Sequence, residues 1–265
     1  MLHAEACDRC PRMQLCESPP PARLQLTVLE FDDVPLRNQL LAALEPTVLS
    51  ELKLHFETVN IARSTTIFGE NDSIGHVYFP ENAVVSFENR LGEGRTVEEG
   101  SVGYEGMAGL SVFLNGYGSS IQAFAQVPGV VRRMDARVFR RLTAAPGSFH
   151  QVMLRYTQAY LAHISRTAKC SAAHLLQERC AGWLLVTRDR VDANVFPFTH
   201  EQLAGALGVR VGGVILAIRW FQEKELIGFT RGRMEIVDAI GLERESCECH
   251  KTVWSEYARL LPAAA

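Results

Sequence analysis

The stretch Thr199–Ile227 (THEQLAGALGVRVGGVILAIRWFQEKELI) has the pattern of two short helices joined by a tight turn. Thr199 stands where an N-cap belongs, because its hydroxyl can accept a hydrogen bond from a free amide of the first turn. Gly208 permits the positive φ that a sharp turn after a helix requires. Apolar residues at three-to-four spacing would line the inner face: Leu203, Ala204 and Leu207 in the first helix, then Val214, Ile215, Ala217, Ile218 and Phe221 in the second. This pattern predicts a helix-turn-helix, and DNA binding as its function.

The remaining face of the second helix carries residues suited to approach a duplex. It offers Arg210, Val211, Gly212, Gly213 and Arg219, and the glycines would let the backbone come close. Residues 229–237 continue as a strand, a tight turn and a strand, with Arg231 and Arg233 flanking the turn glycine. We expect this hairpin to be a wing that meets phosphates. A plain helical hairpin in an all-helical domain is the alternative interpretation.

Charge gives this prediction no separate support. Residues 198–237 hold five basic residues against four acidic ones, and the whole chain has a formal net charge of −3. A protein that bound DNA mainly by releasing counterions would be more basic. Binding would therefore depend on a few placed arginines, on helix N-termini facing phosphates, and on two copies acting together.

Composition places the chain among cytoplasmic globular proteins. Its 265 residues are 47% hydrophobic, without the long apolar run that a membrane span needs. The first residues show neither a basic start nor an apolar segment, so we expect no secretory signal. Seven cysteines, an odd and clustered set, favour a reducing compartment over a disulfide scaffold.

Four regions follow one another along the sequence. We expect a cysteine-containing segment at 1–22, which ends in a proline-rich separator, and a β-roll at 23–148, where short alternating runs are broken by glycine. A helix without glycine or proline follows at 149–173, and a winged helix-turn-helix with a helical tail at 174–265. The fold class is therefore α+β.

The long helix is predicted to pair with its copy in a homodimer. Apolar or small residues recur along it with alternating spacings of three and four, which is typical of helices that pack against a partner. Packing of this stripe on the chain's own roll is the alternative. The predicted interface comprises Phe149, Val152, Tyr156, Tyr160, His163 and Thr167.

The sequence resembles the Crp/Fnr superfamily of bacterial transcription regulators, in which a roll, a long helix and a winged domain follow one another in this order. The likeness covers about residues 36–240 and includes three strings: 69–79 (GENDSIGHVYF), 103–110 (GYEGMAGL) and 198–209 (FTHEQLAGALGV). It implies a homodimer on double-stranded DNA with an inverted-repeat operator, and RNA polymerase as a further candidate partner. It also implies that Thr199 and His200 touch phosphate. Val211 and Gly212 replace the arginine and glutamate typical of well-known members, so the operator sequence does not carry over.

The resemblance argues against cyclic AMP as the signal. Members that bind it hold the phosphate with an arginine in the segment that matches Gly118–Gln122, where this chain has Ser119. Glu105 lies in the string 103–110, which resembles the glycine-bearing cassette of the family, and it would repel a phosphate unless a cation offset it. A different effector in the roll, and a non-DNA-binding interaction module, remain open alternatives.

Cys7, Cys10 and Cys16 offer another sensor. Their C-x2-C-x5-C spacing resembles the oxygen-sensing Fnr branch, whose cysteines hold an iron-sulfur cluster that responds to oxygen or nitric oxide. Where those relatives place a fourth cysteine, near the end of the last roll strand, this chain has Val131-Arg132-Arg133. Asp8, His3, a distant cysteine or an outside molecule would have to complete the set. Zinc, direct thiol oxidation, or no metal are the alternatives.

The other cysteines are weaker candidates. Cys247, Cys249 and His250 are ligand-type residues, but we interpret them as part of an ordinary tail helix, and Cys170 and Cys180 as core or interface thiols. The sequence lacks a P-loop, a G-x-S-x-G elbow and an HExxH motif, and its eight histidines are scattered. We therefore predict a regulator without enzymatic activity.

Overall fold

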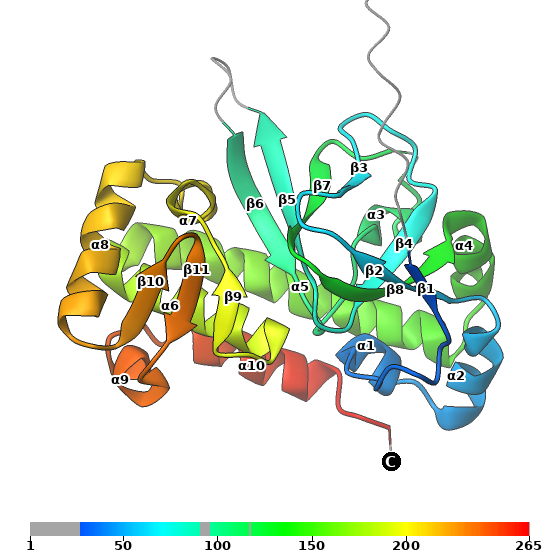
Figure 1. The fold of residues 1–265 in the computed structure, drawn as a ribbon. Coiled ribbons are helices and arrows are strands. Elements are labelled where there is room, and N and C mark those ends of the chain that lie inside the picture. The colour runs from blue at the N-terminus through cyan, green and yellow to red at the C-terminus, as the bar shows by residue number, and fades with distance from the viewer. Residues whose placement is uncertain (1–26, 91–95, 117, 265) are drawn as a thin grey trace, which may run out of the picture.

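The computed structural model describes residues 27–90, 96–116 and 118–264. Within them the strands form two four-stranded sheets in the N-terminal part and one three-stranded sheet in the C-terminal part. A long helix, α5 (Ser148–Ala173), runs beneath both parts (Figure 1). The predicted α+β architecture of roll, long helix and winged domain is confirmed.

The N-terminal part is an antiparallel roll of two sheets, with strand orders β1-β2-β8-β4 and β3-β7-β5-β6. Each strand turns one face toward an apolar interior, which explains the short alternating runs in the sequence. The predicted strand region 121–134 is two strands, which belong to different sheets and are separated by Pro128. The strands are β1 (Thr27–Leu29), β2 (Glu57–Ile61), β3 (Thr66–Phe68), β4 (His76–Pro80), β5 (Val84–Arg90), β6 (Thr96–Val102), β7 (Gln122–Val127) and β8 (Gly129–Asp135).

Short helices pack on the roll. The helix expected near residues 37–44 is α1 (Gln39–Ala42), followed by α2 (Pro46–Lys53), and α3 (Leu110–Phe113) lies in the cassette. The sequence analysis did not anticipate α4 (Ala136–Ala144). It begins where the Asp135 carboxylate accepts hydrogen bonds from the amides of Arg137 and Val138, at 2.8 and 3.2 Å. Such a cap satisfies amides that the helix itself cannot.

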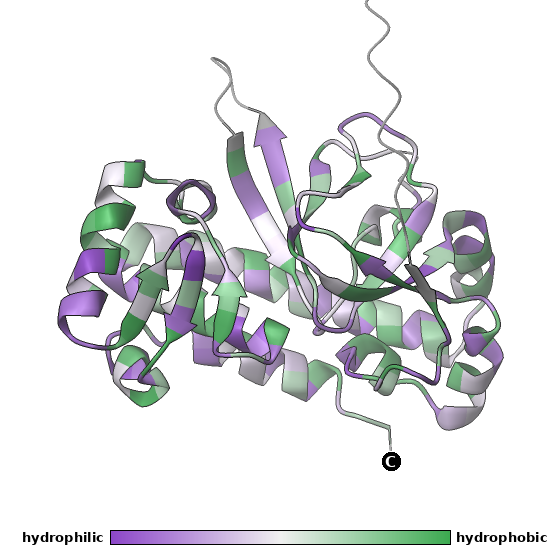
Figure 2. Cartoon of the chain, in the orientation of Figure 1, coloured by the Kyte–Doolittle hydropathy of each residue, from purple (hydrophilic) through white to green (hydrophobic). Residues whose placement is uncertain are grey.

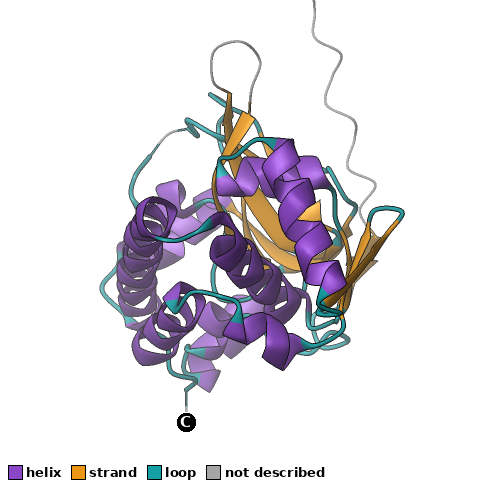
Figure 3. Cartoon of the chain, turned by 90° about the vertical axis from the view of Figure 1, so that its left-hand side faces the viewer, coloured by secondary structure: helices purple, strands orange, loops and turns teal. Residues whose placement is uncertain are grey.

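The C-terminal part joins helices and a small sheet of order β10-β11-β9. Its core takes apolar residues from the helices and from all three strands. In Figure 2 the first half of α8 is mostly hydrophobic and its end is hydrophilic, and Figure 3 shows the helices grouped together with the strands of the molecule behind and beside them. The elements are α6 (Leu176–Val191), β9 (Val195–Pro197), α7 (His200–Leu207), α8 (Val211–Glu223), β10 (Ile227–Thr230), β11 (Arg233–Ile236), α9 (Ala239–Arg244) and α10 (Cys249–Leu260). The helical tail is thus two helices, and α10 lies along α5 (Figure 1).

This return of the tail covers the face of α5 that we predicted to be the dimer interface. Val253, Tyr257 and Leu260 of α10 share one core cluster with that face. The Tyr156 hydroxyl is hydrogen-bonded to the backbone of Met107 in the roll. By exposure the six predicted residues divide as follows: Phe149, Val152 and Tyr156 are buried, Tyr160 and His163 are half-buried, and Thr167 is exposed. Phe149, Val152 and Tyr156 therefore pack within their own chain, which is the alternative stated for this stripe, whereas a dimer contact by Tyr160, His163 and Thr167 stays a prediction.

A second stripe runs along the opposite, solvent-exposed side of α5. Its leucines are Leu154, 45% exposed, and Leu161, 62% exposed, with Ile164 beside them at 38%. Alternating steps of three and four residues are the repeat by which two helices pair along a seam. We call this set the exposed α5 stripe: Gln151, Leu154, Gln158, Leu161, Ser165 and Ala168.

His163 makes stability depend on pH. Burial, with the charge of Arg190, lowers the pKa of this histidine to about 4. In the unfolded chain histidine titrates near 6.5, so protonation favours unfolding as the pH falls from about 6.5 through about 4. On this account we expect the free energy of unfolding to fall by about 2 kcal/mol from pH 7.5 to pH 5. Urea denaturation at both pH values would show a correspondingly smaller fall in the free energy of unfolding for His163→Gln. Equal falls in the variant and the wild type would contradict the assignment of this pH dependence to His163.

Within the described residues no single helix is long and apolar enough to cross a membrane, and only α7 and α8 taken together, bent by 110°, reach that composition.

Candidate nucleic-acid interface and a cysteine-histidine group

Helix α7 begins and ends as the sequence predicts. The Thr199 hydroxyl accepts a hydrogen bond from the Gln202 amide at 3.2 Å, and the Gln202 side chain accepts one from the Thr199 amide at 3.1 Å. This reciprocal capping box satisfies two amides at the helix start. Gly208 ends the helix with φ of +64°, and the axis of α8 then turns by 110°. The helix-turn-helix is therefore present.

Buried apolar side chains hold α8 in place. Of the predicted inner face only Ile215 is half-buried, and the rest lie in one core with the strands of the small sheet. Because this packing leaves little freedom of rotation, it determines which side of α8 faces solvent. The buried members are Leu203, Ala204, Leu207, Val214, Ala217, Ile218 and Phe221.

The outer face of α8 presents Arg210 at its N-cap, then Gly212 and Arg219, all exposed. Leu216 lies between them and is 66% exposed. The sequence analysis missed this leucine, although its place four residues after Gly212 and three before Arg219 would have revealed it. We call these four residues the α8 outer face.

Two of the predicted DNA-contacting residues lie at the margin of that face. Val211 is half-buried and packs against the core of the winged domain. Gly213 faces α6, and a Cβ added there would lie 3.0 Å from Leu176 Cδ2, whereas one added at Gly212 would meet nothing within 4 Å. Close helix packing therefore explains Gly213, while Gly212 is open to solvent.

The predicted wing forms as an antiparallel hairpin. Thr230 pairs with Arg233, and the turn between β10 and β11 has Arg231 and Gly232 at φ of +50° and +75°. Positive φ at both central residues suits the twist of a two-residue hairpin. The side chains of Arg231 and Arg233 are exposed. Strand β9, which we did not predict, completes the sheet by pairing with β11.

Thr199 and His200 are half-buried and already have partners inside the chain. The Thr199 hydroxyl serves as the helix cap, and the His200 ring packs at 4.7 Å, centroid to centroid, on Phe229. From the roll, Arg63 donates a 2.6 Å hydrogen bond to the Gln202 side chain. The start of α7 therefore contacts the roll, and α7 itself lies against β6.

A buried ion pair also connects the two parts. Glu105, in the cassette of the roll, accepts a hydrogen bond from Arg190 of α6 at 2.6 Å. The same guanidinium donates to the Ser101 hydroxyl at 2.9 Å and to the Ser101 carbonyl at 3.0 Å. The charge that could offset Glu105 thus comes from α6, while Ser119 donates its hydroxyl to the Ile121 carbonyl.

A pocket of about 250 Å³ opens between the cassette, the 118–121 segment and α5. Apolar side chains dominate its wall, including Phe68, Phe87, Met107 and Leu110. The described residues that line it include no lysine or arginine, so they offer no cation to a phosphate.

Four ligand-type side chains meet where the end of α5 reaches the start of α10. The donor atoms of Cys170, His174, Cys247 and Cys249 all lie within 4.8 Å of one another. Burial raises the pKa of the Cys170 thiol, with the neighbouring Cys247 as a further cause, and burial also raises the pKa of the Cys249 thiol. We call these residues the Cys3His group.

This group departs from the sequence analysis in two ways. Cys170 and two tail cysteines converge, although Cys170 had been interpreted as a core or interface thiol. His174 replaces His250, whose ring contacts the Ser246 hydroxyl and the Cys247 carbonyl instead. Cys180 stays apart, fully buried. The predicted ligands Cys7, Cys10 and Cys16 lie outside the described residues.

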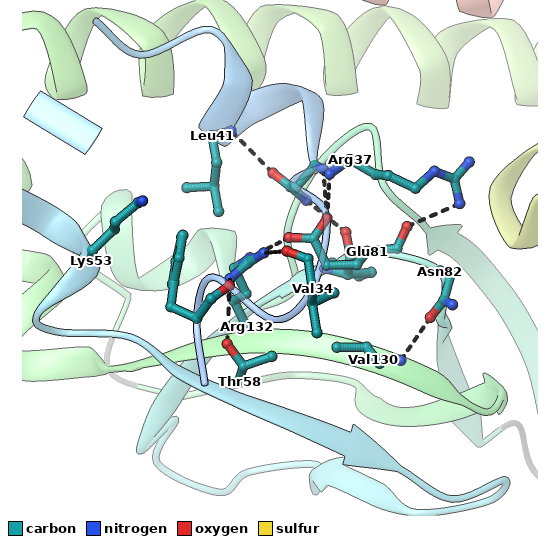
Figure 4. A network of polar contacts seen from close by, with 12 residues as sticks. Val34, Arg37, Leu41, Lys53, Thr58, Glu81, Asn82, Val130 and Arg132 are labelled. Atoms are coloured by element: carbon teal, nitrogen blue, oxygen red, sulfur yellow. Dashed lines mark hydrogen bonds and ion pairs between the residues drawn. The ribbon is translucent and has the colours of Figure 1, made fainter. Parts of the chain in front are cut away.

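Arg132 lies in the segment 131–133, where the resemblance to Fnr-type regulators would place a fourth cysteine. Figure 4 shows its guanidinium among polar groups from several segments, with the Glu81 carboxylate as its ion-pair partner. The side chain of Arg132 is 0% exposed and that of Glu81 is 2% exposed. A buried ion pair therefore replaces any cysteine ligand at this position.

Comparisons with known proteins agree with this arrangement. Residues 178–245 match the family model of the Crp-like helix-turn-helix domain. No curated protein matches the sequence. TTHB099, a CRP-family transcriptional regulator of Thermus thermophilus, shares 21% identity and a TM-score of 0.60, covering 71% of this chain and 95% of its own.

Two further solved structures are similar. FixK2 of Bradyrhizobium japonicum has 17% identity and a TM-score of 0.61, over 72% of this chain and 96% of its own. CLP, a c-di-GMP responsive global regulator of Xanthomonas campestris, has 14% identity and a TM-score of 0.56, over 72% of this chain and 99% of its own. Residues 178–245 are thus a Crp-like helix-turn-helix domain, carried by a chain with the overall fold of the Crp/Fnr regulators.

Proposed function

We propose that the chain is a homodimeric, DNA-binding transcription regulator of the Crp/Fnr type. The observation that carries the proposal is the α8 outer face, which holds two exposed arginines and an open glycine in a Crp-like domain. A helix of this kind enters the major groove with its N-terminal residues foremost, and the wing arginines would meet the backbone alongside. We expect an inverted-repeat operator, with half-sites about one helical turn apart.

The exposed α5 stripe supports the dimer. It leaves two large leucines in solvent on a long helix whose other side is already covered. Pairing of two such stripes would bury them and set two winged domains side by side. RNA polymerase remains a candidate partner for the assembled dimer.

The signal, in this proposal, is not cyclic AMP. The apolar pocket beside the cassette offers no cation among its described residues, and Arg190 already pairs with Glu105. The spacing of Cys7, Cys10 and Cys16 favours a response to oxygen, nitric oxide or redox state, with an iron-sulfur cluster as the candidate cofactor. A small apolar effector is the second candidate, because the pocket of about 250 Å³ suits such a molecule.

Arg210→Ala tests the DNA interface. Losing a base contact reduces affinity by about 1–3 kcal/mol, so we expect operator binding to weaken at least about tenfold when both protomers change. Gel shifts would use an operator selected from an inverted-repeat library, at fixed salt. Arg259→Ala is the matched control, because that arginine is exposed on α10 and pairs with Glu256 of the same helix.

The wild-type protein provides the decisive comparison. Binding to neither random duplex at low salt nor the inverted-repeat library, under both aerobic and anaerobic conditions, would overturn the proposal. The winged domain would then be a protein-interaction module.

A further inference from the structure

The Cys3His group has the dimensions of a site for a single tetrahedral ion. Zinc binds thiolate at about 2.3 Å and imidazole nitrogen at about 2.0–2.1 Å. Tetrahedral angles then place two sulfurs about 3.8 Å apart, and a sulfur and a nitrogen about 3.6 Å apart. The structure has Cys170 Sγ 3.5 Å from Cys247 Sγ, and Cys249 Sγ 3.6 Å from His174 Nδ1.

The same distances disfavour an iron-sulfur cluster at this place. A cluster divides its protein ligands between two or more irons with bridging sulfides between them, so ligands on different irons stand farther apart than the ligands of one ion. All four donor atoms here lie within 4.8 Å of one another. A cluster would need the end of α5 and the start of α10 to separate, whereas one ion fits the arrangement as it stands.

His174 has the surroundings of a metal ligand. Its Nδ1 faces Cys249, while its Nε2 lies 3.4 Å from a carboxylate oxygen of Glu248. In zinc sites the ring nitrogen that does not bind the metal donates its proton to such a carboxylate, which orients the ring. This second contact is independent of the sulfur geometry.

We propose that Cys170, His174, Cys247 and Cys249 bind one zinc ion. The three thiols release their protons to solvent as the ion enters, and the imidazole binds in its neutral form. Four protein ligands complete the tetrahedron and leave no open position, which is the form of a structural site. Iron-sulfur chemistry at the N-terminal cysteines is a separate matter.

The position of the site suggests what the ion fastens. Cys170 and His174 lie one turn apart at the end of α5, and Cys247 and Cys249 precede and begin α10. The matched domain ends at residue 245, just before the tail ligands. Zinc would therefore clamp the exit of the winged domain to the long helix. Any effect on operator affinity rests on the proposed function, whereas zinc binding does not.

Metal analysis of the full chain tests the site. Protein purified with reductant should contain about one zinc per chain, and Cys249→Ser should lose it. Cys180→Ser is the matched control, because that thiol is buried outside the group. A triple variant with serine at Cys7, Cys10 and Cys16 should keep its zinc. Cobalt exchanged into the wild-type protein should give the visible absorption of a tetrahedral thiolate site. This measurement does not depend on the folding of any variant.

Glu248→Gln tests the orienting carboxylate. Loss of such a partner weakens metal binding by about 10–100-fold, and we expect about tenfold in competition with a chelator. Glu256→Gln on the same helix is the control, because its carboxylate pairs with Arg259 and not with the group.

Three results would overturn the proposal: iron and sulfide lost in Cys249→Ser, a Cys170–Cys247 disulfide in metal-free protein under reductant, or equal zinc in all variants. The zinc site and the proposed regulator function can be tested separately. Zinc-loaded protein without DNA binding refutes only the regulator, and operator binding by wild-type protein that takes up no zinc refutes only the site.

Discussion

Replacing Arg132 with alanine is expected to destabilise the chain by about 3–5 kcal/mol, because it leaves a buried carboxylate without its cation. Arg132 lies on β8, fully buried, and its Nε donates to Glu81. The other oxygen of Glu81 accepts from the backbone amides of Arg37 and Asn38, at 2.6 and 2.9 Å. Those amides cannot neutralise the charge by themselves.

The guanidinium also holds the segment between β1 and α1 against the roll. It donates to the carbonyls of Phe31 and Val34 at 2.9 and 2.8 Å, and it stacks on the Phe31 ring at 3.6 Å. Figure 4 shows Val34 beside it. Thr58 of β2 accepts a further bond at 3.3 Å. The substitution therefore removes contacts to three segments at once.

Urea denaturation would measure this effect, with Arg133→Ala as the matched control. Arg133 is the next residue on β8, but its partner Glu57 is 54% exposed, and exposed pairs contribute only about 0–1 kcal/mol. Arg132→Met combined with Glu81→Gln should be less destabilised than Arg132→Ala, since no charge stays buried alone. Similar decreases in the free energy of unfolding for Arg132→Ala and Arg133→Ala would contradict this account.

The helix-turn-helix could be predicted from the sequence because its determinants are local. Thr199, Gly208 and the apolar spacing of α8 lie within one short stretch, and each acts on its neighbours in the chain. Arg132 is the opposite case. An arginine in a strand is ordinarily exposed, and only the folded roll brings Glu81 and two carbonyl groups to it.

The Cys3His group escaped prediction because its halves are far apart in sequence. Cys170 and His174 stand one helical turn apart, which is also common in ordinary helices, and over seventy residues separate them from Cys247. Neither half is a recognisable motif. The return of α10 along α5 brings the halves together, and no local pattern announces that packing.

That same return explains why half of the predicted α5 interface is buried in its own chain. Two stripes run along this helix with steps of three and four residues, and the exposed one alternates its leucines with glutamines before it ends in Ser165 and Ala168. Periodicity identifies such stripes but does not say which one meets the chain's own core. The stripe with the larger aromatic residues is covered by the roll and α10, which leaves the leucine-bearing stripe for a partner.

Leu161→Glu should therefore convert a dimer into monomers and weaken binding to a full inverted-repeat operator by about 10²–10⁴-fold. Linking two binding modules raises apparent affinity by that factor without any new contact, and dissociation removes the gain. Leu161 is 62% exposed in a single chain, so the carboxylate should leave the monomer's fold intact. In a paired stripe the same carboxylate would face its copy across the seam.

Light scattering would give the oligomeric state, and gel shifts on full and half operators would separate dimerisation from contact chemistry. Half-operator affinity should stay unchanged in Leu161→Glu, because the α8 outer face is untouched. Leu54→Glu is the control, since that leucine is 87% exposed at the end of α2, away from α5. A Leu161→Glu protein that stays dimeric and keeps its full-operator affinity would show that another surface joins the two copies.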